Sequence, residues 1–440
     1  MKPEIRWLGH CAVVVAAVLC GVSDPCLSAQ VSSFTETHYR LKLTIDPVQK
    51  SIQGEEVLSL ELAAPAQDLQ LDAEEIQISD LQTGPALESW KQDKEHLLLH
   101  FRQPLVLHQK LVVRLKYHGQ PKDGLTWEGG GAQALYDSPH WMVCDMKPGS
   151  LAGFDLEAHF PATMQMAASG VLVRESVQNG EKISVWSQRQ PVAPFVLGFV
   201  VGNLQEARLT AEGVQLRLLS EKHSPEQLKK IFAVTGDALR FFSDHAGFAL
   251  APAQYTEAMV SGSPMQELAE MTVLPVDYGD ELLNKDEKDI ALLVHELAHQ
   301  WWGIRVPCAD WDDFWLNEGM ANFMTDAFLE KEYGAEAYRQ AVAVHRDIYR
   351  KGKEKGKDHA LCLHGWKTPS DASGWVAYHK GAYVLSLLRE KLGDEAFWRG
   401  LRDYSSSHQG SPVTSKDLQT AMEKSSGHSL QAFFDEWVYA

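Results

Sequence analysis

The sequence predicts a multi-domain protein in which an all-β domain is followed by an α+β domain made mainly of helices. Short apolar runs that alternate with polar residues fill roughly residues 31–205, and no helical periodicity interrupts them. The pattern changes at Val214, where a strand is followed by Ser224-Pro225, a typical helix cap with proline at the first position. Helical periodicity dominates after residue 284. We therefore expect one domain at 30–205 and a second at 206–440.

The amino terminus has the features of an export signal. Lys2 and Arg6 precede an apolar run at residues 11–22, and Leu27-Ser28-Ala29 offers small residues for cleavage. The apolar run is too short to be a comfortable membrane span. We expect residues 1–29 to be removed from an exported protein, periplasmic or extracellular, whose mature chain has no stable membrane span. The alternative is that this segment is retained as a short anchor.

Period-two alternation predicts the strands of the first domain. Residues 38–45 alternate as a half-buried strand should, and Asn179-Gly180 is a typical hairpin turn. The predicted strands are His38–Ile45, Glu56–Leu62, Asp68–Leu71, Ile76–Ile78, His96–Phe101, Leu111–Tyr117, Val171–Val173, Ile183–Trp186 and Val196–Val201. No cluster of metal ligands or nucleophiles appears among them, so we expect this domain to pack against the second one and to frame the substrate.

The second domain begins with alternating strands and helices. We expect a strand at Val214–Leu219, then a helix that starts after Ser224 and continues through Phe242, then a strand at Tyr255–Val260. Long helices follow. This order indicates an α+β domain.

Composition limits the partners of the chain. A net charge of −18 argues against nucleic acid or an anionic membrane as a partner. Beyond the signal the cysteines are Cys144, Cys308 and Cys362, an odd and widely spaced set that forms no disulfide framework, although one bridge is allowed. We expect them to be small buried residues.

One stretch carries the chemistry of the chain. His295 and His299 lie four residues apart in the motif HELAH, so a helix places both imidazoles on one face. Glu318 follows His299 by 19 positions, far enough for the chain to return on a second helix. Two imidazoles and one carboxylate leave one position open on Zn²⁺, the arrangement of a catalytic site. Glu296 is the natural general base beside them. We expect one zinc ion per chain.

The alternative is a pair of core histidines that binds no metal. The setting of the motif favours the metal, because an acidic start at residues 286–289 leads into an apolar stripe on the same helix. The segment that contains Glu318 also opens a further amphipathic run, which reaches Tyr333 and is closed by Gly334. A pair of histidines buried in the core would require only the apolar stripe, and not these further features.

Three stretches resemble the aminopeptidase N/leukotriene hydrolase family of zinc metallopeptidases: HELAHQWWG, the W-x-D-x-W-L-N-E-G segment that contains Glu318, and Tyr378-His379-Lys380-Gly381-Ala382. The resemblance covers nearly the whole chain after the signal. It implies a saddle-like β domain followed by a thermolysin-like catalytic domain. Many members continue into a large helical domain that roofs the site. This chain stops at Ala440, so the resemblance implies that the roof is lacking and the cavity more open, unless a second subunit covers it.

The resemblance also assigns residues to roles. It implies that Tyr378 donates a hydrogen bond to the oxyanion of a tetrahedral intermediate. Gln133, in a glycine-rich segment, matches a glutamine that contacts substrate in the family. The family usually has an acidic residue seven positions after the third ligand. This chain has Thr325 at that position and Asp326 next to it. The residues that surround its metal ligands therefore differ from the family pattern.

The loop that holds the substrate α-ammonium departs from the family pattern. Family members use the glutamate of a Gly-x-Met-Glu-Asn loop. Counted from Met265, the neutral Gln266 takes that place, and Glu267 is the nearest carboxylate. Glu270 competes with Glu267 for this role, and a third possibility is that neither glutamate touches substrate.

We therefore expect an exported zinc aminopeptidase that removes N-terminal residues from peptides. A zinc endopeptidase or an epoxide hydrolase on the same scaffold is the nearest rival, and the altered loop favours it. A non-catalytic peptide-binding protein is a rival of another class. The presence of all five residues His295, Glu296, His299, Glu318 and Tyr378 argues against it, because binding alone does not need them.

Overall fold

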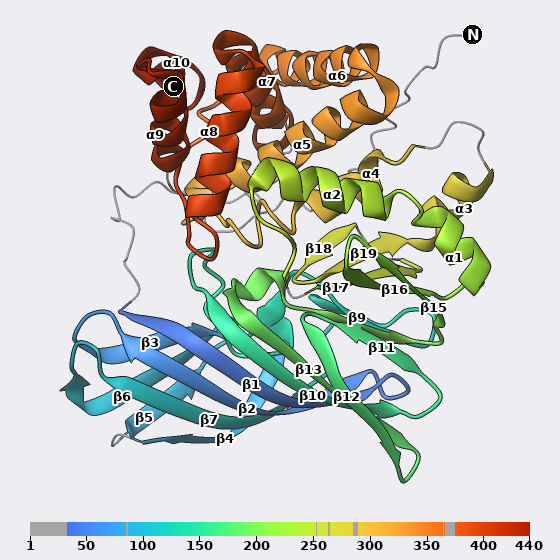
Figure 1. Ribbon diagram of the computed structural model, residues 1–440. Helices are drawn as coiled ribbons and strands as arrows, with labels where there is room; N and C mark the ends of the chain where they lie inside the picture. Colours follow the sequence, from blue (N-terminus) through green and yellow to red (C-terminus); the bar gives the residue numbers. More distant parts are fainter. Residues whose placement is uncertain are drawn as a thin grey trace.

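The N-terminal half of the chain is built from sheets and most of the C-terminal half from helices, in the computed structural model (Figure 1). The structure describes residues 33–84, 87–251, 253–262, 265–284, 289–363, 365 and 375–440. The predicted fold class, a β-rich domain followed by a mainly helical one, is confirmed. The predicted export signal at 1–29 lies outside the described residues.

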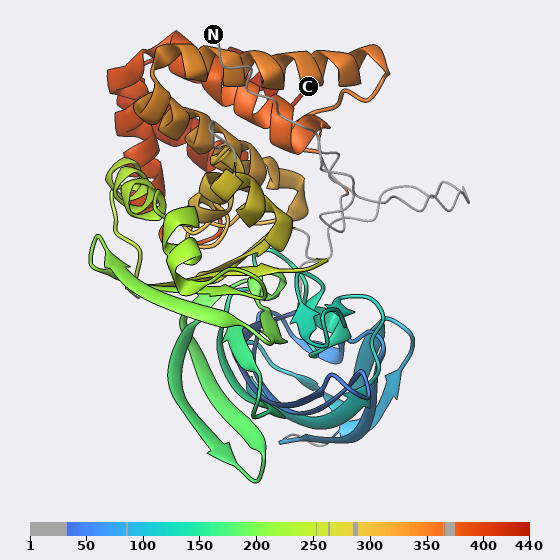
Figure 2. The same ribbon diagram turned by 90° about the vertical axis from the view of Figure 1, so that its right-hand side faces the viewer.

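Three sheets make up the first part of the chain. The largest has seven strands in the order β12-β13-β10-β1-β2-β7-β4, and the others are β3-β6-β5 and β11-β14-β9-β8. Figure 2 shows that these strands curve strongly. Their bounds are β1 Phe34–Asp46, β2 Ser51–Leu62, β3 Ala66–Asp72, β4 Ile76–Thr83, β5 Leu87–Gln92, β6 His96–Leu105, β7 Lys110–Gly119, β8 Leu125–Thr126, β9 Ala132–Ala134, β10 Ala152–Pro161, β11 Gln165–Ala168, β12 Val171–Gln178, β13 Glu181–Val192 and β14 Phe199–Gly202, with 3₁₀ turns η1 at Ser138–His140 and η2 at Pro194–Val196.

Alternation explains why β1 forms as predicted. Its residues are buried and exposed in turn, with Tyr39, Leu41 and Leu43 in the core. The hairpin between β12 and β13 turns at Asn179-Gly180, and both residues have positive φ, as the sequence predicts. Val196–Val201 is only partly a strand, because Pro194 opens a 3₁₀ turn before β14.

Strand β10 was not predicted, although it lies between β1 and β13 at the middle of the large sheet. It runs parallel to β1, whereas its pairing with β13 is antiparallel. The exposed face of β10 carries Asp155 and Glu157, and such residues are depleted in strands. Buried and less buried residues do alternate along β10, but its acidic residues made the segment look unlike a strand in the sequence.

The second part of the chain combines one mixed sheet with the helices. The sheet has the order β15-β16-β17-β19-β18. The bounds are β15 Gln205–Ala211, β16 Val214–Ser220, β17 Gln254–Val260, β18 Gln266–Leu268 and β19 Met271–Pro275, then α1 Pro225–Ile231, α2 Thr235–Ala246, α3 Val276–Asn284, α4 Ala291–Ala298, α5 Trp315–Tyr333, α6 Ala335–Glu354, α7 Gly381–Leu392, α8 Asp394–Ser407, α9 Ser415–Ser426 and α10 Gln431–Trp437, with a 3₁₀ turn η3 at Trp311–Asp313 and a π-helical turn η5 at Trp375–Lys380.

The predicted single helix from Ser224 to Phe242 is wrong, because the chain turns between α1 and α2. The predicted cap is present: the Ser224 hydroxyl accepts from the Gln227 amide, and the Gln227 side chain accepts from the Ser224 amide. After α1, residues 232–234 form a turn. The turn gives each helix its own buried face, since α1 packs on β15 and β16 while α2 packs on α4 and α8.

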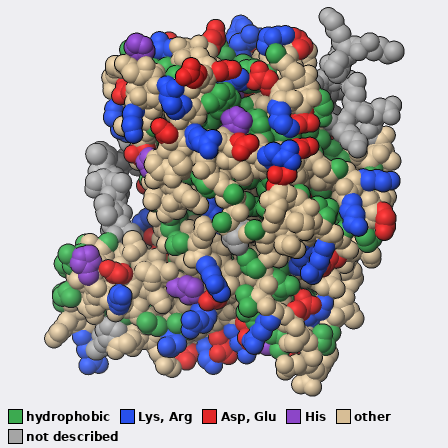
Figure 3. Space-filling view, in the orientation of Figure 1, with side chains coloured by type: hydrophobic (Ala, Val, Ile, Leu, Met, Phe, Trp, Pro, Cys, Tyr) green, Lys and Arg blue, Asp and Glu red, His purple; other side chains and the backbone are tan. Residues whose placement is uncertain are grey.

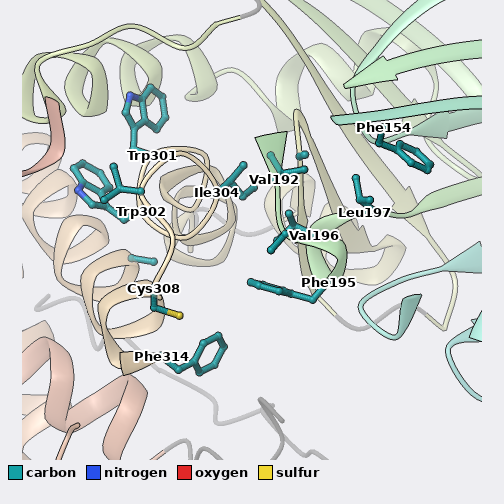
Figure 4. Packing of buried hydrophobic residues seen from close by; sticks show 14 of the residues in the cluster. Phe154, Val192, Phe195, Val196, Leu197, Trp301, Trp302, Ile304, Cys308 and Phe314 are labelled. Atoms are coloured by element: carbon teal, nitrogen blue, oxygen red, sulfur yellow. The ribbon is translucent and has the colours of Figure 1, made fainter. Parts of the chain in front are cut away.

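One hydrophobic core runs through both parts of the chain. Figure 4 shows Val192, Phe195 and Val196 from the β-rich part facing Ile304 and other residues of the helical part. The ring of Phe195 also lies 5.1 Å from that of Trp311. The two parts therefore bury apolar surface against each other. Basic and acidic side chains are interspersed on the outer face that Figure 3 shows.

No helix in the described part of the chain is long and apolar enough to cross a membrane. Cys144, Cys308 and Cys362 are free thiols, and the first two are buried as predicted, whereas Cys362 is half-buried.

The buried carboxyl of Glu56 on β2 generates a prediction about stability. It is 1% exposed and accepts a hydrogen bond of 2.9 Å from the Val143 amide. Burial raises its pKa from 4.5 to about 8. The folded state therefore holds a proton that the unfolded state releases, and the stability linked to it is complete below the unfolded pKa and is lost as the pH rises through the folded pKa. We expect Glu56→Gln to weaken the fall in unfolding free energy between about pH 5 and pH 8.

Urea unfolding at several pH values measures this effect. At low pH the variant should lie within about 1 kcal/mol of the wild type, because an amide still accepts from Val143. The matched control is Glu55→Gln, since Glu55 is on the same strand but exposed. An unchanged pH slope in Glu56→Gln would contradict the prediction.

Candidate metal centre

Three potential ligand atoms converge at the meeting point of α4 and α5. The Nε2 atoms of His295 and His299 lie 3.1 Å apart. The Oε2 atom of Glu318 lies 3.5 Å from the first and 3.4 Å from the second. All three residues are buried, with an exposed fraction of at most 9%. The structure therefore brings the three predicted ligands together.

The local structure explains how the imidazoles reach this point. His295 is on α4, and His299 is the residue directly after it, still with helical φ and ψ. The Nδ1 atom of His299 lies 3.1 Å from the carbonyl oxygen of Trp302, to which it donates, so its Nε2 is free to accept. The chain passes this ring closely at Gly303, which has φ +122°, and a Cβ there would lie 3.1 Å from His299 Nδ1.

Helix α5 delivers Glu318 from the other side. The sequence predicts an amphipathic run to Tyr333, but every residue from Trp315 to Leu329 is buried, so that prediction is wrong. The reason is packing on several sides, since α4, α6 and α7 all contact α5. The predicted end at Gly334 is correct, and this residue has φ +88°.

The charges at this point fit a cation. Glu267, Glu296 and Glu318 are all buried here beside two imidazoles. Burial raises the pKa of Glu296 well above its usual range and that of Glu267 to about 7. Burial alone would lower the pKa of His299, but the neighbouring carboxylates raise it to about 10. Burial alone would raise the pKa of Glu318, but the imidazoles of His299 and His295 lower it to about 2.

Zinc is the metal that this donor set suits. Among the described residues, Glu318 Oε2 accepts no well-formed hydrogen bond, and two imidazole Nε2 atoms face each other beside it. Two nitrogens and one carboxylate oxygen, buried and close together, are ligands that Zn²⁺ prefers. His295, His299 and Glu318 therefore fit zinc.

The other predicted residues lie around these ligands. A second group of potential ligand atoms, from Glu267, Glu296 and His299, is also mutually within 4.8 Å. The ring of Tyr378 is nearly parallel to that of His295, at 21°, with centroids 6.4 Å apart. Tyr378 is half-buried and lies on η5. The structure thus brings Glu267, Glu296 and Tyr378 to the same site.

The two glutamates that compete for the substrate anchor have different surroundings. Glu267 lies on β18 and accepts a hydrogen bond of 2.7 Å from the Gln266 side chain. Glu270 instead accepts from the Arg305 guanidinium, and Gln188 on β13 lies 3.5 Å from the same oxygen. Glu270 is 1% exposed and is taken up by this contact between the two parts of the chain, so it is not available to a substrate ammonium.

Gln133 and Met265 lie near the same loop. The Gln133 amide nitrogen on β9 donates to the Ser261 carbonyl at 2.8 Å, while its Oε1 is buried and accepts nothing from the described residues. Met265 is half-buried directly before β18 and packs against the core. The predicted contact of Gln133 with substrate stays a prediction, with Oε1 as the available acceptor.

Gln300 is a residue whose role the sequence analysis missed. Its side-chain nitrogen donates to the Leu268 carbonyl at 2.9 Å, and its Oε1 accepts from the Glu270 amide at 3.0 Å. Gln300 therefore fixes the turn between β18 and β19, and with it the position of Glu267. Its place directly after the second histidine of HELAHQ is the signal that was available.

The glycines of two motifs touch each other. Gly319 follows Glu318 on α5, and Gly381 opens α7 three residues after Tyr378. A Cβ on Gly319 would lie 2.8 Å from the Gly381 Cα, and one on Gly381 would lie 2.9 Å from the Gly319 Cα. No larger residue fits such backbone contact without a shift. The helix that carries Glu318 and the turn that carries Tyr378 can approach because both residues are glycine.

We predict that Gly381→Ala separates these two elements and displaces Tyr378. The kcat should fall while bound zinc is retained, and the free energy of unfolding should fall by about 1–3 kcal/mol. Steady-state kinetics, metal analysis and urea unfolding measure the three quantities. The control is Gly236→Ala, inside α2, where the added Cβ meets only the Ala211 methyl group, at 3.0 Å. Unchanged kcat in a folded Gly381→Ala would refute the prediction.

Comparisons with known proteins agree with this site. Residues 263–437 match the model of the Peptidase family M1 domain. The chain is 23% identical over 93% of its length to aminopeptidase N of Lactococcus lactis subsp. lactis, and 23% identical over 91% to aminopeptidase M1 of Arabidopsis thaliana. It covers 51% and 49% of these two proteins, so it spans about half the length of the curated relatives it matches.

Solved structures match over most of both chains. The M1 zinc metallopeptidase from Deinococcus radiodurans is 25% identical, with a TM-score of 0.78 over 93% of this chain and 94% of that chain. A mutant of that protein bound to a Tyr-Ser-Ala substrate gives a TM-score of 0.77 over 92% and 94%. The resemblance drawn from the motifs is confirmed: residues 263–437 match the Peptidase family M1 domain, and the chain is similar over most of its length to aminopeptidase N proteins and to M1 zinc metallopeptidases.

Proposed function

We propose that this protein is a zinc-dependent aminopeptidase, which hydrolyses the first peptide bond of peptides with a free amino terminus. The observation that carries the proposal is the position of Glu267 beside Glu296 and His299, next to the three ligand atoms. A carboxylate at this place is suited to hold an α-ammonium while the adjoining carbonyl lies at the metal. The names of the relatives, and the tripeptide bound to the solved neighbour, support a peptide as substrate.

His295, His299 and Glu318 would hold one zinc ion per chain. When bound, zinc supplies Lewis-acid activation of water and of the scissile carbonyl. Glu296 accepts the proton of the attacking water and passes it to the leaving amine as the C–N bond breaks. Its buried position favours proton uptake, because burial raises its pKa.

Tyr378 and Glu267 act on the substrate itself. The phenol of Tyr378 donates a hydrogen bond to the oxygen that becomes negative as water adds to the carbonyl. Glu267 accepts charge-assisted hydrogen bonds from the α-ammonium, and the Gln266 amide at 2.7 Å holds its carboxylate in place. We further propose that the protein is exported, on the pattern of residues 1–29.

Aminoacyl reporters and their N-acetylated versions test the proposed reaction. The wild type should cleave the free reporters, lose activity on exhaustive chelation and regain it with zinc. Glu296→Gln should keep its zinc but lose turnover by a factor of about 100 or more, because an amide cannot take the proton.

The rivals give different results in the same experiment. Efficient cleavage of acetylated substrates or of internal bonds indicates an endopeptidase, and hydrolysis of an epoxide substrate indicates an epoxide hydrolase. Binding of peptides without turnover of any substrate indicates a binding protein. Full activity after complete removal of the metal contradicts the zinc mechanism.

A further prediction concerns the proposed role of Glu267 in holding the substrate α-ammonium. Glu267→Gln removes the charge with little change in shape, and we expect the preference for free over acetylated reporters to fall about 10- to 100-fold, the value of a charged hydrogen bond. Glu270→Gln is the control, because Glu270 pairs with Arg305, and its folded fraction should keep the preference. If Glu270→Gln loses the preference and Glu267→Gln keeps it, the two roles are reversed.

A further inference from the structure

A contact between two histidines holds the turn that carries Tyr378. The Nδ1 atom of His379, the residue after Tyr378, lies 2.8 Å from the Nδ1 atom of His345 on α6. His345 is 1% exposed. Its other ring nitrogen, Nε2, lies 3.3 Å from Oδ2 of Asp326, which is on α5 and is also 1% exposed. The contact thus joins α5, α6 and η5 through buried polar groups.

The protons of this group can be placed from its neighbours. Two imidazole nitrogens at 2.8 Å need one donor and one acceptor, and a neutral imidazole offers one of each. The Asp326 carboxyl favours the proton of His345 on Nε2, so His345 Nδ1 is left to accept from the Nδ1–H of His379. Burial and the neighbouring imidazoles lower the pKa of His379 to about 3, which makes it neutral.

The residues that follow Tyr378 are each held by a different element. His379 is held by α6, Gly381 by α5, and Lys380 donates to the His359 carbonyl at 2.7 Å and to Asp358 at 3.2 Å. π-helical turns are rare and are frequently found at functional sites. A phenylalanine at position 345 would fill the same space. The polar ring of His345 therefore does more than pack, because it also makes the contact with His379.

We propose that His345, oriented by Asp326, is a positioning residue for Tyr378, acting through its hydrogen bond to His379. This inference rests on the proposed role of Tyr378 as the donor to the oxyanion. His345 does not touch the substrate. It restricts η5 to the arrangement in which the phenol lies beside His295, and so it contributes to turnover without contributing to substrate binding.

Two substitutions of His345 separate this role from packing. His345→Phe keeps the ring but removes the acceptor, and we expect kcat to fall by about tenfold with KM changed by less than roughly twofold. His345→Asn loses volume but places an amide oxygen near the former Nδ1, and kcat should stay within about threefold of the wild type. A residue needed only for packing gives the opposite order, and that order would overturn the proposal.

A double-mutant cycle tests whether the effect passes through Tyr378. In the Tyr378→Phe background, His345→Phe should lower kcat no further, because the group that it positions is already gone. Additive losses would show that His345 acts by another route. If Tyr378→Phe alone leaves kcat unchanged, the proposed function of Tyr378 fails, and that result is distinct from failure of the positioning role.

Two further variants guard against misfolding. His379→Leu breaks the same hydrogen bond at a half-buried position and should reproduce the loss of kcat if His345→Phe does not fold. His223→Phe is the matched control, since His223 is also 1% exposed and contacts an aspartate, Asp280, at 3.2 Å, but far from η5 in the chain. It should affect stability and leave kcat unchanged. Normal kcat in folded His379→Leu would refute the proposal.

Discussion

The burial of three carboxyl groups beside two imidazoles is the constraint on which the helical half of the chain depends. Such a group is costly to remove from water unless a cation or a dense set of hydrogen bonds compensates it. The structure supplies rigid supports around it: the Trp302 carbonyl on His299, Gln300 on the turn after Glu267, and the backbone contact between α5 and α7. These supports keep the ligands converged, and a bound metal would add to the stability of the fold.

The residues of the motifs fall into two groups, those suited to the chemistry of the site and those that hold the surrounding elements in place. In the stretch that begins with Tyr378, the ring of that tyrosine lies beside His295, while Lys380 and Gly381 hold the turn. In HELAHQ, the final glutamine holds a different element from the one that carries the histidines. A metal site of this kind is therefore assembled by contacts among the motifs.

The sequence predicts well what depends on local pattern. Alternation located β1 and its neighbour β2, and a spacing of four placed His295 and His299 on one face. Prediction failed where distant contacts decide. The break between α1 and α2, the burial of α5 on all sides and the pairing of Glu270 with Arg305 all come from elements far away in the sequence. The ambiguity between Glu267 and Glu270 has the same origin, because a local count cannot tell which carboxylate has a partner.

The position of β10 has a consequence for how the molecule folds. Strand β1 begins at Phe34, yet one of its two neighbours in the sheet is β10, which begins at Ala152. More than a hundred residues must be synthesised before this edge of β1 is covered, and the loop that the pairing closes is long. During synthesis the apolar face and one edge of β1 therefore stay exposed, and a nascent chain in this condition is prone to aggregate and suited to recognition by a chaperone.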